Sequence, residues 1–219
     1  MTEHIRWVTW AVALLALLGV ASAAHATALP APSVDVAVPN LATFTGTSVV
    51  ADTGNLSYSA GGATGTVREW VVANGTGALC AGCLSFVYQF TVTAGSIGRL
   101  SASSYDAFTV DVSHSLNLSP LLVGSINGGF GPQNADRDAT GATIDFDFNP
   151  AVTTSSSLLI ANTNATASQS GIMFLNSATG ASSANIAGFV PGQPTVPEPA
   201  TLLLIGSGVV ALGVWRRRS

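Results

Sequence analysis

The two cysteines of the sequence, Cys80 and Cys83, are separated by two residues. A Cys-x-x-Cys pair can carry out thiol–disulfide exchange in a thioredoxin-like setting, or it can supply half of a four-cysteine zinc site. The surrounding residues lack the alternating strands and helices that would indicate the first chemistry. The even cysteine count and the signs of export described below favour a small disulfide that tightens the turn before the next strand.

His114 is the only histidine after residue 25. A Ser-His-Asp site needs one histidine close to a nucleophile and to an orienting acid. The sequence contains no nucleophile-elbow motif, and His114 lies at the end of a predicted strand. We therefore interpret it as a surface histidine, and we expect a protein that is not an enzyme and needs no cofactor.

Asp136, Asp138, Asp145 and Asp147 place four carboxylates within a dozen residues. Calcium prefers such oxygen ligands, so these residues are candidate calcium ligands, although their spacing matches no EF-hand loop. Asp145 and Asp147 alternate with apolar residues, so a strand with an acidic outer face explains them more simply. The same two could form a glycosidase pair, but a separation of about 7 Å on one strand face selects no reaction type.

Threonines gather in three short segments, at residues 43–47, 64–66 and 91–93. A flat threonine array would suit contact with ice or with a glycan. Threonine is also common in strands, and these segments do not recur at a fixed period. Ice binding is therefore kept only as a minor alternative.

Strands must position all these residues. Short runs of alternating apolar and polar residues, separated by Gly, Asn, Ser and Asp, predict an antiparallel sheet. The clearest run, residues 84–93, places Leu84, Phe86, Tyr88 and Phe90 on alternate positions. Further strands are predicted at residues 66–73, 97–103, 108–114, 142–148, 156–161, 171–176 and 186–190. About nine or ten strands with frequent turns indicate an all-β body of the β-sandwich or jelly-roll type.

The composition is polar but poor in charge. Charged residues make up 8% of the 219 residues, against about 25% in an average soluble domain. There is no lysine, and residues 27–196 contain three arginines against nine carboxylates. An acidic body of this kind cannot hold a phosphate backbone, which argues against nucleic acid as a partner.

The N-terminus has the pattern of a signal peptide. Arg6 precedes an apolar run at residues 7–20, and small residues follow. The small-x-small pattern at Ala24 and Ala26 predicts cleavage after Ala26, with residues 21–23 as an alternative site. An apolar core of about 14 residues is shorter than the roughly 20 needed to span a bilayer, so an uncleaved anchor is less favoured.

The C-terminal tail combines a Pro-Glu-Pro tripeptide, an apolar segment at 202–215 and a basic end. The tripeptide with its preceding residue is Val196, Pro197, Glu198 and Pro199, and the basic end is Arg216, Arg217 and Arg218. The prolines hold an extended segment outside the membrane. Fourteen helical residues would reach only about 21 Å, less than a hydrocarbon core of about 30 Å. The arginines stay cytoplasmic by the positive-inside rule, which leaves the body outside.

Together these features resemble the PEP-CTERM sorting signal. The resemblance implies export across the inner membrane of a Gram-negative bacterium, transient anchoring in that membrane, and processing by exosortase, a membrane cysteine protease. A plain membrane anchor is the alternative. Residues 83–90, 144–148 and 157–164 also resemble the extracellular region often found ahead of such tails, which implies a sandwich without implying a reaction.

The sequence therefore predicts a signal helix at 1–26, a linker at 27–40, a β-sandwich domain at 41–191, and a sorting tail at 192–219 with a short transmembrane helix at 202–215. We expect a non-enzymatic protein of the cell surface or extracellular matrix, with exosortase as a partner and exopolysaccharide or biofilm as its surroundings. The alternatives are a carbohydrate-binding module using exposed aromatic residues such as Trp70 or Tyr105, an ice-binding module, and a secreted hydrolase.

Overall fold

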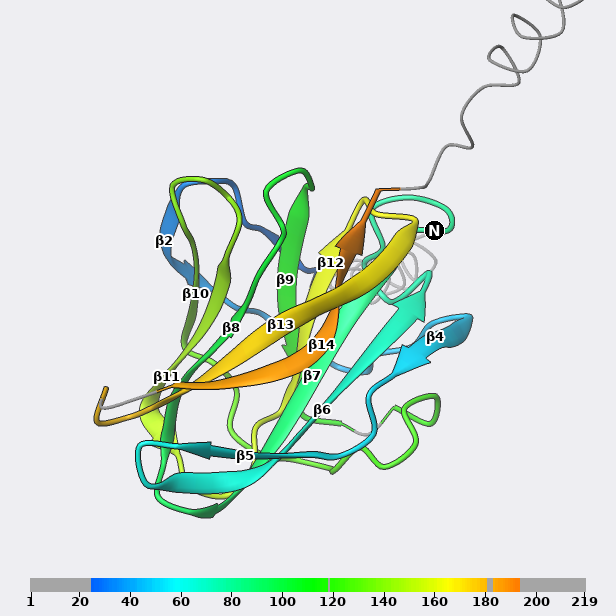
Figure 1. Ribbon diagram of the computed structural model, residues 1–219. Helices are drawn as coiled ribbons and strands as arrows, with labels where there is room; N and C mark the ends of the chain where they lie inside the picture. Colours follow the sequence, from blue (N-terminus) through cyan, green and yellow to red (C-terminus); the bar gives the residue numbers. More distant parts are fainter. Residues whose placement is uncertain (1–24, 118, 181–182, 194–219) are drawn as a thin grey trace, which may run out of the picture.

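The computed structural model describes residues 25–117, 119–180 and 183–193, which form two antiparallel β-sheets (Figure 1). The predicted signal helix, apart from residues 25–26, and the predicted sorting tail, apart from residues 192–193, lie outside the described residues. Within those residues, no helix is long and apolar enough to cross a membrane. The all-β prediction is confirmed for the described body.

Sheet A contains eight strands. Across the sheet the order is β1 (Thr27–Ala28), β9 (Val110–Ser115), β12 (Leu158–Thr163), β7 (Leu84–Ala94), β6 (Ala63–Ala73) and β4 (Ser48–Asp52). Two further strands join this path. β3 (Asn40–Leu41) pairs in parallel with β9, and β5 (Leu56–Ala60) pairs with β6.

Sheet B contains six strands, all paired antiparallel. Their order is β14 (Ser183–Gly192), β13 (Ala167–Ser177), β8 (Ile97–Ala102), β11 (Ile144–Val152), β10 (Asn134–Arg137) and β2 (Ser33–Ala37). In Figure 1, β13 and β14 cross in front of β12 and β7. The main hydrophobic core lies between the sheets and joins side chains of both, for example Phe86 with Leu100 and Phe146.

The central strands of sheet A are buried on both faces. A second core on its outer face contains Leu41, Phe44, Trp70, Val72, Val87, Leu122, Leu158 and Ile160. Phe44 and Leu122 in this core belong to the connections at 42–47 and 116–133, which therefore cover the sheet. Every residue of β12 is buried for this reason, which explains its unbroken apolar start. A strand covered on both faces does not need to alternate.

All eight predicted strands are present, with their ends shifted by a few residues. The linker prediction for residues 27–40 is wrong, because this segment contains β1, β2 and the first residue of β3. Leu29 within it is almost fully buried in the main core. These strands are too short or too irregular to show a period in the sequence, and only their pairing with β9 and β10 makes them strands.

Candidate functional site: the Arg137 cavity and the sorting tail

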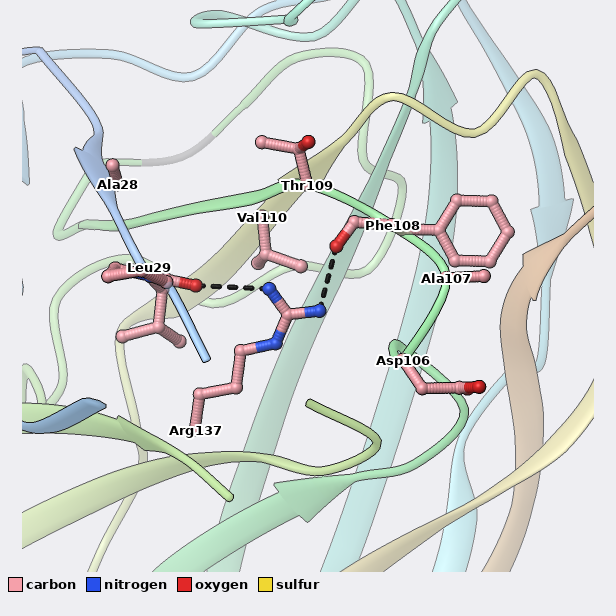
Figure 2. Close-up of a pocket in the computed structure, with 9 residues that line it drawn as sticks. Ala28, Leu29, Asp106, Ala107, Phe108, Thr109, Val110 and Arg137 are labelled. Carbon is pink, nitrogen blue, oxygen red and sulfur yellow. Dashed lines mark hydrogen bonds between the residues drawn. The ribbon is translucent and has the colours of Figure 1, made fainter. Parts of the chain in front are cut away.

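A cavity of about 400 Å³ opens near the start of the described chain. Its walls come from residues 28–30, from residues 106–110 at the entry into β9, and from Arg137 at the end of β10 (Figure 2). These segments are distant in sequence, and the pairing of β1 with β9 and of β2 with β10 brings them together.

Arg137 is buried and makes four hydrogen bonds to backbone carbonyls. Nη1 donates to the Leu29 carbonyl over 3.1 Å, and Nη2 donates to the Phe108 carbonyl over 2.7 Å (Figure 2). Nη2 also donates to the Tyr105 carbonyl over 2.5 Å, and Nε donates to the Gly141 carbonyl over 3.1 Å. One side chain thus joins three separate stretches of backbone.

The local sequence explains why Arg137 points inward. In β10 the even and odd positions differ in exposure, and Ala135 and Arg137 are the two buried residues. The hairpin into β11 contains Gly141 at φ +75°, where a Cβ would lie 3.3 Å from Arg137 Nη2. Glycine therefore allows the backbone to approach the guanidinium closely.

The charge of Arg137 has no direct counter-ion among the described residues, whose ion pairs involve Arg68 and Arg99 instead. Burial lowers the pKa of Arg137, and the more distant carboxylates of Asp138 and Asp106 oppose that effect. A guanidinium stays protonated through the physiological range even when its pKa is lowered. The cavity wall therefore carries a cation whose direct hydrogen-bond partners are neutral carbonyls.

The predicted calcium ligands occupy the outer face of sheet B, where Arg99 lies among them. Arg99 Nε is 2.5 Å from Asp147 Oδ1, Nη1 is 3.3 Å from Asp145 Oδ2, and Nη2 is 3.9 Å from Asp136 Oδ2. Asp138 instead accepts a bond from the Thr140 hydroxyl in the hairpin turn. The described chain contains no group of three or more His, Cys, Asp or Glu residues arranged to hold a metal.

The alternation along β11 places its two aspartates on the outer face of sheet B. Ile144 and Phe146 of β11 are buried, while Asp145 and Asp147 face outward, as the alternation predicted. Partial burial raises the pKa of Asp147, and the Arg99 guanidinium opposes that shift. Arg99 pairs with Asp147 across the β8–β11 ladder, a contact that spacing along the chain could not reveal.

The interpretation of His114 as a surface residue is wrong. His114 lies inside β9, is 9% exposed, and its Nδ1 has no hydrogen-bond partner. A Cβ at Gly131 would lie 2.5 Å from its ring, so the connection between β9 and β10 covers the histidine. Burial lowers the pKa of His114, which favours the neutral form.

The prediction that Trp70 and Tyr105 are exposed for carbohydrate contact is also wrong. Trp70 is 1% exposed, and Tyr105 is fully buried. Trp70 packs in the outer core beside the Arg68 guanidinium, 5.1 Å from the ring centre. The Tyr105 hydroxyl is 2.6 Å from the Tyr88 hydroxyl in the main core. Neither ring is available to stack on a sugar.

Two of the three threonine segments, 64–66 and 91–93, form cross-strand pairs between β6 and β7. Thr64 and Thr93 hydroxyls are 3.1 Å apart, and those of Thr66 and Thr91 are 2.8 Å apart. Each hydroxyl therefore has a partner within the sheet, and the pairs add to the stability of this ladder.

Glu69 is a buried carboxyl that no motif in the sequence marks. It lies in β6 opposite Tyr88, is fully buried, and its Oε2 accepts the Phe189 N–H of β14 over 2.7 Å. Burial raises the pKa of Glu69 to about 8, while the Phe189 N–H and the Tyr88 hydroxyl oppose the shift. Glu69 therefore links sheet A to sheet B from inside the core.

Cys80 and Cys83 form the predicted disulfide, with their Cα atoms 5.1 Å apart. The bridge closes the tip of the connection between β6 and β7, where the Asn74 N–H also donates to the Cys83 carbonyl. Cys83 is buried directly before β7, so the pair tightens the entry into that strand.

Replacing both Cys80 and Cys83 by serine is expected to lower the free energy of unfolding by about 2 kcal/mol or less, because the closed loop is short. Urea denaturation of the exported double variant against the parent measures the loss. A thiol assay of the unfolded parent should find no free thiol. Two free thiols in the parent would contradict the disulfide.

The tail is the part of the chain that matches a known family. The PEP-CTERM protein-sorting motif matches residues 195–218. Comparison with curated proteins and with solved structures gave no match. The motif implies recognition by exosortase, export and membrane-associated sorting. The predicted sorting signal is therefore confirmed: the chain carries a PEP-CTERM protein-sorting motif at its C-terminus.

Proposed function

We propose that this chain is a non-enzymatic protein of the bacterial cell surface or extracellular matrix, delivered by its tail and released by exosortase. The observation that carries the proposal is the sorting motif at residues 195–218. The last described strand, β14, ends at Gly192, so the motif follows the folded body almost directly.

The chemistry of the body supports a role without turnover. The groups first considered for catalysis have structural surroundings: His114 is buried, and Asp145 and Asp147 pair with Arg99. The charge-poor composition, rich in serine, threonine and asparagine, suits a hydrated polymer matrix such as exopolysaccharide. Turnover of glycans or esters by the exported protein, abolished by H114A or D145N, would overturn this part of the proposal.

The sorting step is tested by mass spectrometry of the protein released from cells. We expect a mature C-terminus near Pro197–Pro199 and an N-terminus at Thr27 when exosortase is present. In an exosortase-deficient host, the intact tail through Ser219 should remain on the protein and the protein should stay with the membrane. A released protein that keeps Arg216–Ser219 would contradict processing.

A further inference from the structure

The cavity beside Arg137 carries a positive charge that the sorting function does not use. A guanidinium has five N–H donors, and Arg137 uses four bonds to satisfy carbonyls of Leu29, Tyr105, Phe108 and Gly141. One donor on Nη1 remains. The carbonyls orient the guanidinium, and no carboxylate among the described residues pairs with it directly. A ligand carboxylate on the remaining donor would form a charge-assisted hydrogen bond.

The cavity has the size and the mixture of walls that small ligands need. A volume of about 400 Å³ falls within the usual range of about 300–1,000 Å³ for such sites. Leu29 and Val110 are apolar lining residues of the cavity, and Thr109 is a polar one. The Asp106 carboxylate, also in the wall, can accept bonds only from donors such as ligand hydroxyls.

We propose that this cavity binds a small hydroxylated carboxylic acid, with its carboxylate against Arg137 and its hydroxyls toward Asp106 and Thr109. One cation is matched by one carboxylate. A dianion such as phosphate would face repulsion from Asp106 and from a body in which acids outnumber arginines. The ligand source is either a free sugar acid or a uronate unit of a polysaccharide, since both present this chemistry.

The test is an NMR titration of the exported, ¹⁵N-labelled protein with sodium D-glucuronate. D-glucose serves as the uncharged control, and sodium acetate at equal ionic strength lacks the hydroxyls. We expect saturable shifts in the amides of residues 106–110 and in the Arg137 Nε–H signal, with glucuronate binding at least about tenfold more tightly than glucose. Saturation at lower concentrations of a glucuronate oligomer would identify a polymer unit, and equal affinity would identify the free acid.

A pair of matched variants tests the location without removing Arg137, which also supports the fold. Ala107→Trp should fill the mouth of the cavity and abolish the shifts, because Ala107 is exposed in its wall. Ala187→Trp places the same ring at an exposed alanine on β14 and should leave them intact. No saturation by glucuronate, equal response to glucose, or persistence in A107W would overturn the proposal. These outcomes do not depend on the tail, so they are separable from failure of the sorting proposal.

Discussion

Replacing Arg137 by methionine is expected to lower the free energy of unfolding by about 3–5 kcal/mol. Methionine has comparable length but donates no hydrogen bond, so the four backbone carbonyls now bound by the guanidinium lose their donor. Two of these carbonyls belong to Leu29 and Tyr105, both almost fully buried residues. Urea denaturation followed by tryptophan fluorescence measures the change.

The matched control is Arg99→Met. The Arg99 side chain is 42% exposed and pairs with carboxylates on a solvent-facing sheet surface. Ion pairs of this exposed kind contribute about 1 kcal/mol or less. The R137M loss should therefore exceed the R99M loss severalfold, and R137K should fall between them because lysine lacks the planar fork. Equal losses in R137M and R99M would refute the role of Arg137 as the link between these backbone segments.

The stability of the body is expected to fall as the pH rises through neutrality, and Glu69→Gln should remove this fall. The folded carboxyl keeps its proton up to a pKa of about 8, whereas the ordinary value is 4.5. Between these values the folded state binds the extra proton, so each pH unit removes up to about 1.4 kcal/mol from the free energy of unfolding. The contribution is fully present below pH 4.5 and is lost as the pH passes through about 8.

The groups that contact Glu69 make the glutamine variant informative. Tyr88 faces it across the β6–β7 ladder, Tyr105 bonds to Tyr88, and the Phe189 N–H donates to it from β14. A glutamine can accept the same N–H bond and does not ionise. Parent and E69Q should therefore have similar stability near pH 5, and the variant should be several kcal/mol more stable at pH 8.

Two other titrating residues define the pH range for this measurement. The lowered pKa of His114 adds stability above its ordinary value of 6.5 that is lost as the pH falls through that region. Burial also raises the pKa of Asp147, so D147N is the matched carboxyl control. Denaturation curves from pH 6.5 to 8.5 therefore isolate Glu69. A slope in E69Q equal to that of the parent would contradict the assignment.

Local features of the chain allowed the sorting tail, the disulfide and most strands to be predicted. The tail is a contiguous motif, and Cys80 and Cys83 are too close in sequence to need the fold to bring them together. Residues 84–93 show the period of two because β7 presents Phe86 and Tyr88 to the main core. These properties depend on neighbours along the chain, which the sequence records directly.

The exposure of several residues could not be predicted, because it depends on which connections cover sheet A. Trp70 and His114 lie on strands whose polar and apolar pattern suggested an open face, yet the connections around Phe44 and Leu122 cover it. A period of two identifies a strand but does not say whether its second face is solvent or a packed loop.

The sequence by itself determined that this protein carries a sorting signal, because such a tail is read as a short linear motif. Only the tertiary structure decided where its buried charges lie. Arg137 reaches the Leu29 carbonyl across 108 residues, and Glu69 reaches the Phe189 N–H across 120. No local pattern encodes such partners, because they meet only when sheets A and B pack. That packing raises the pKa of Glu69 and surrounds the Arg137 guanidinium with neutral carbonyls.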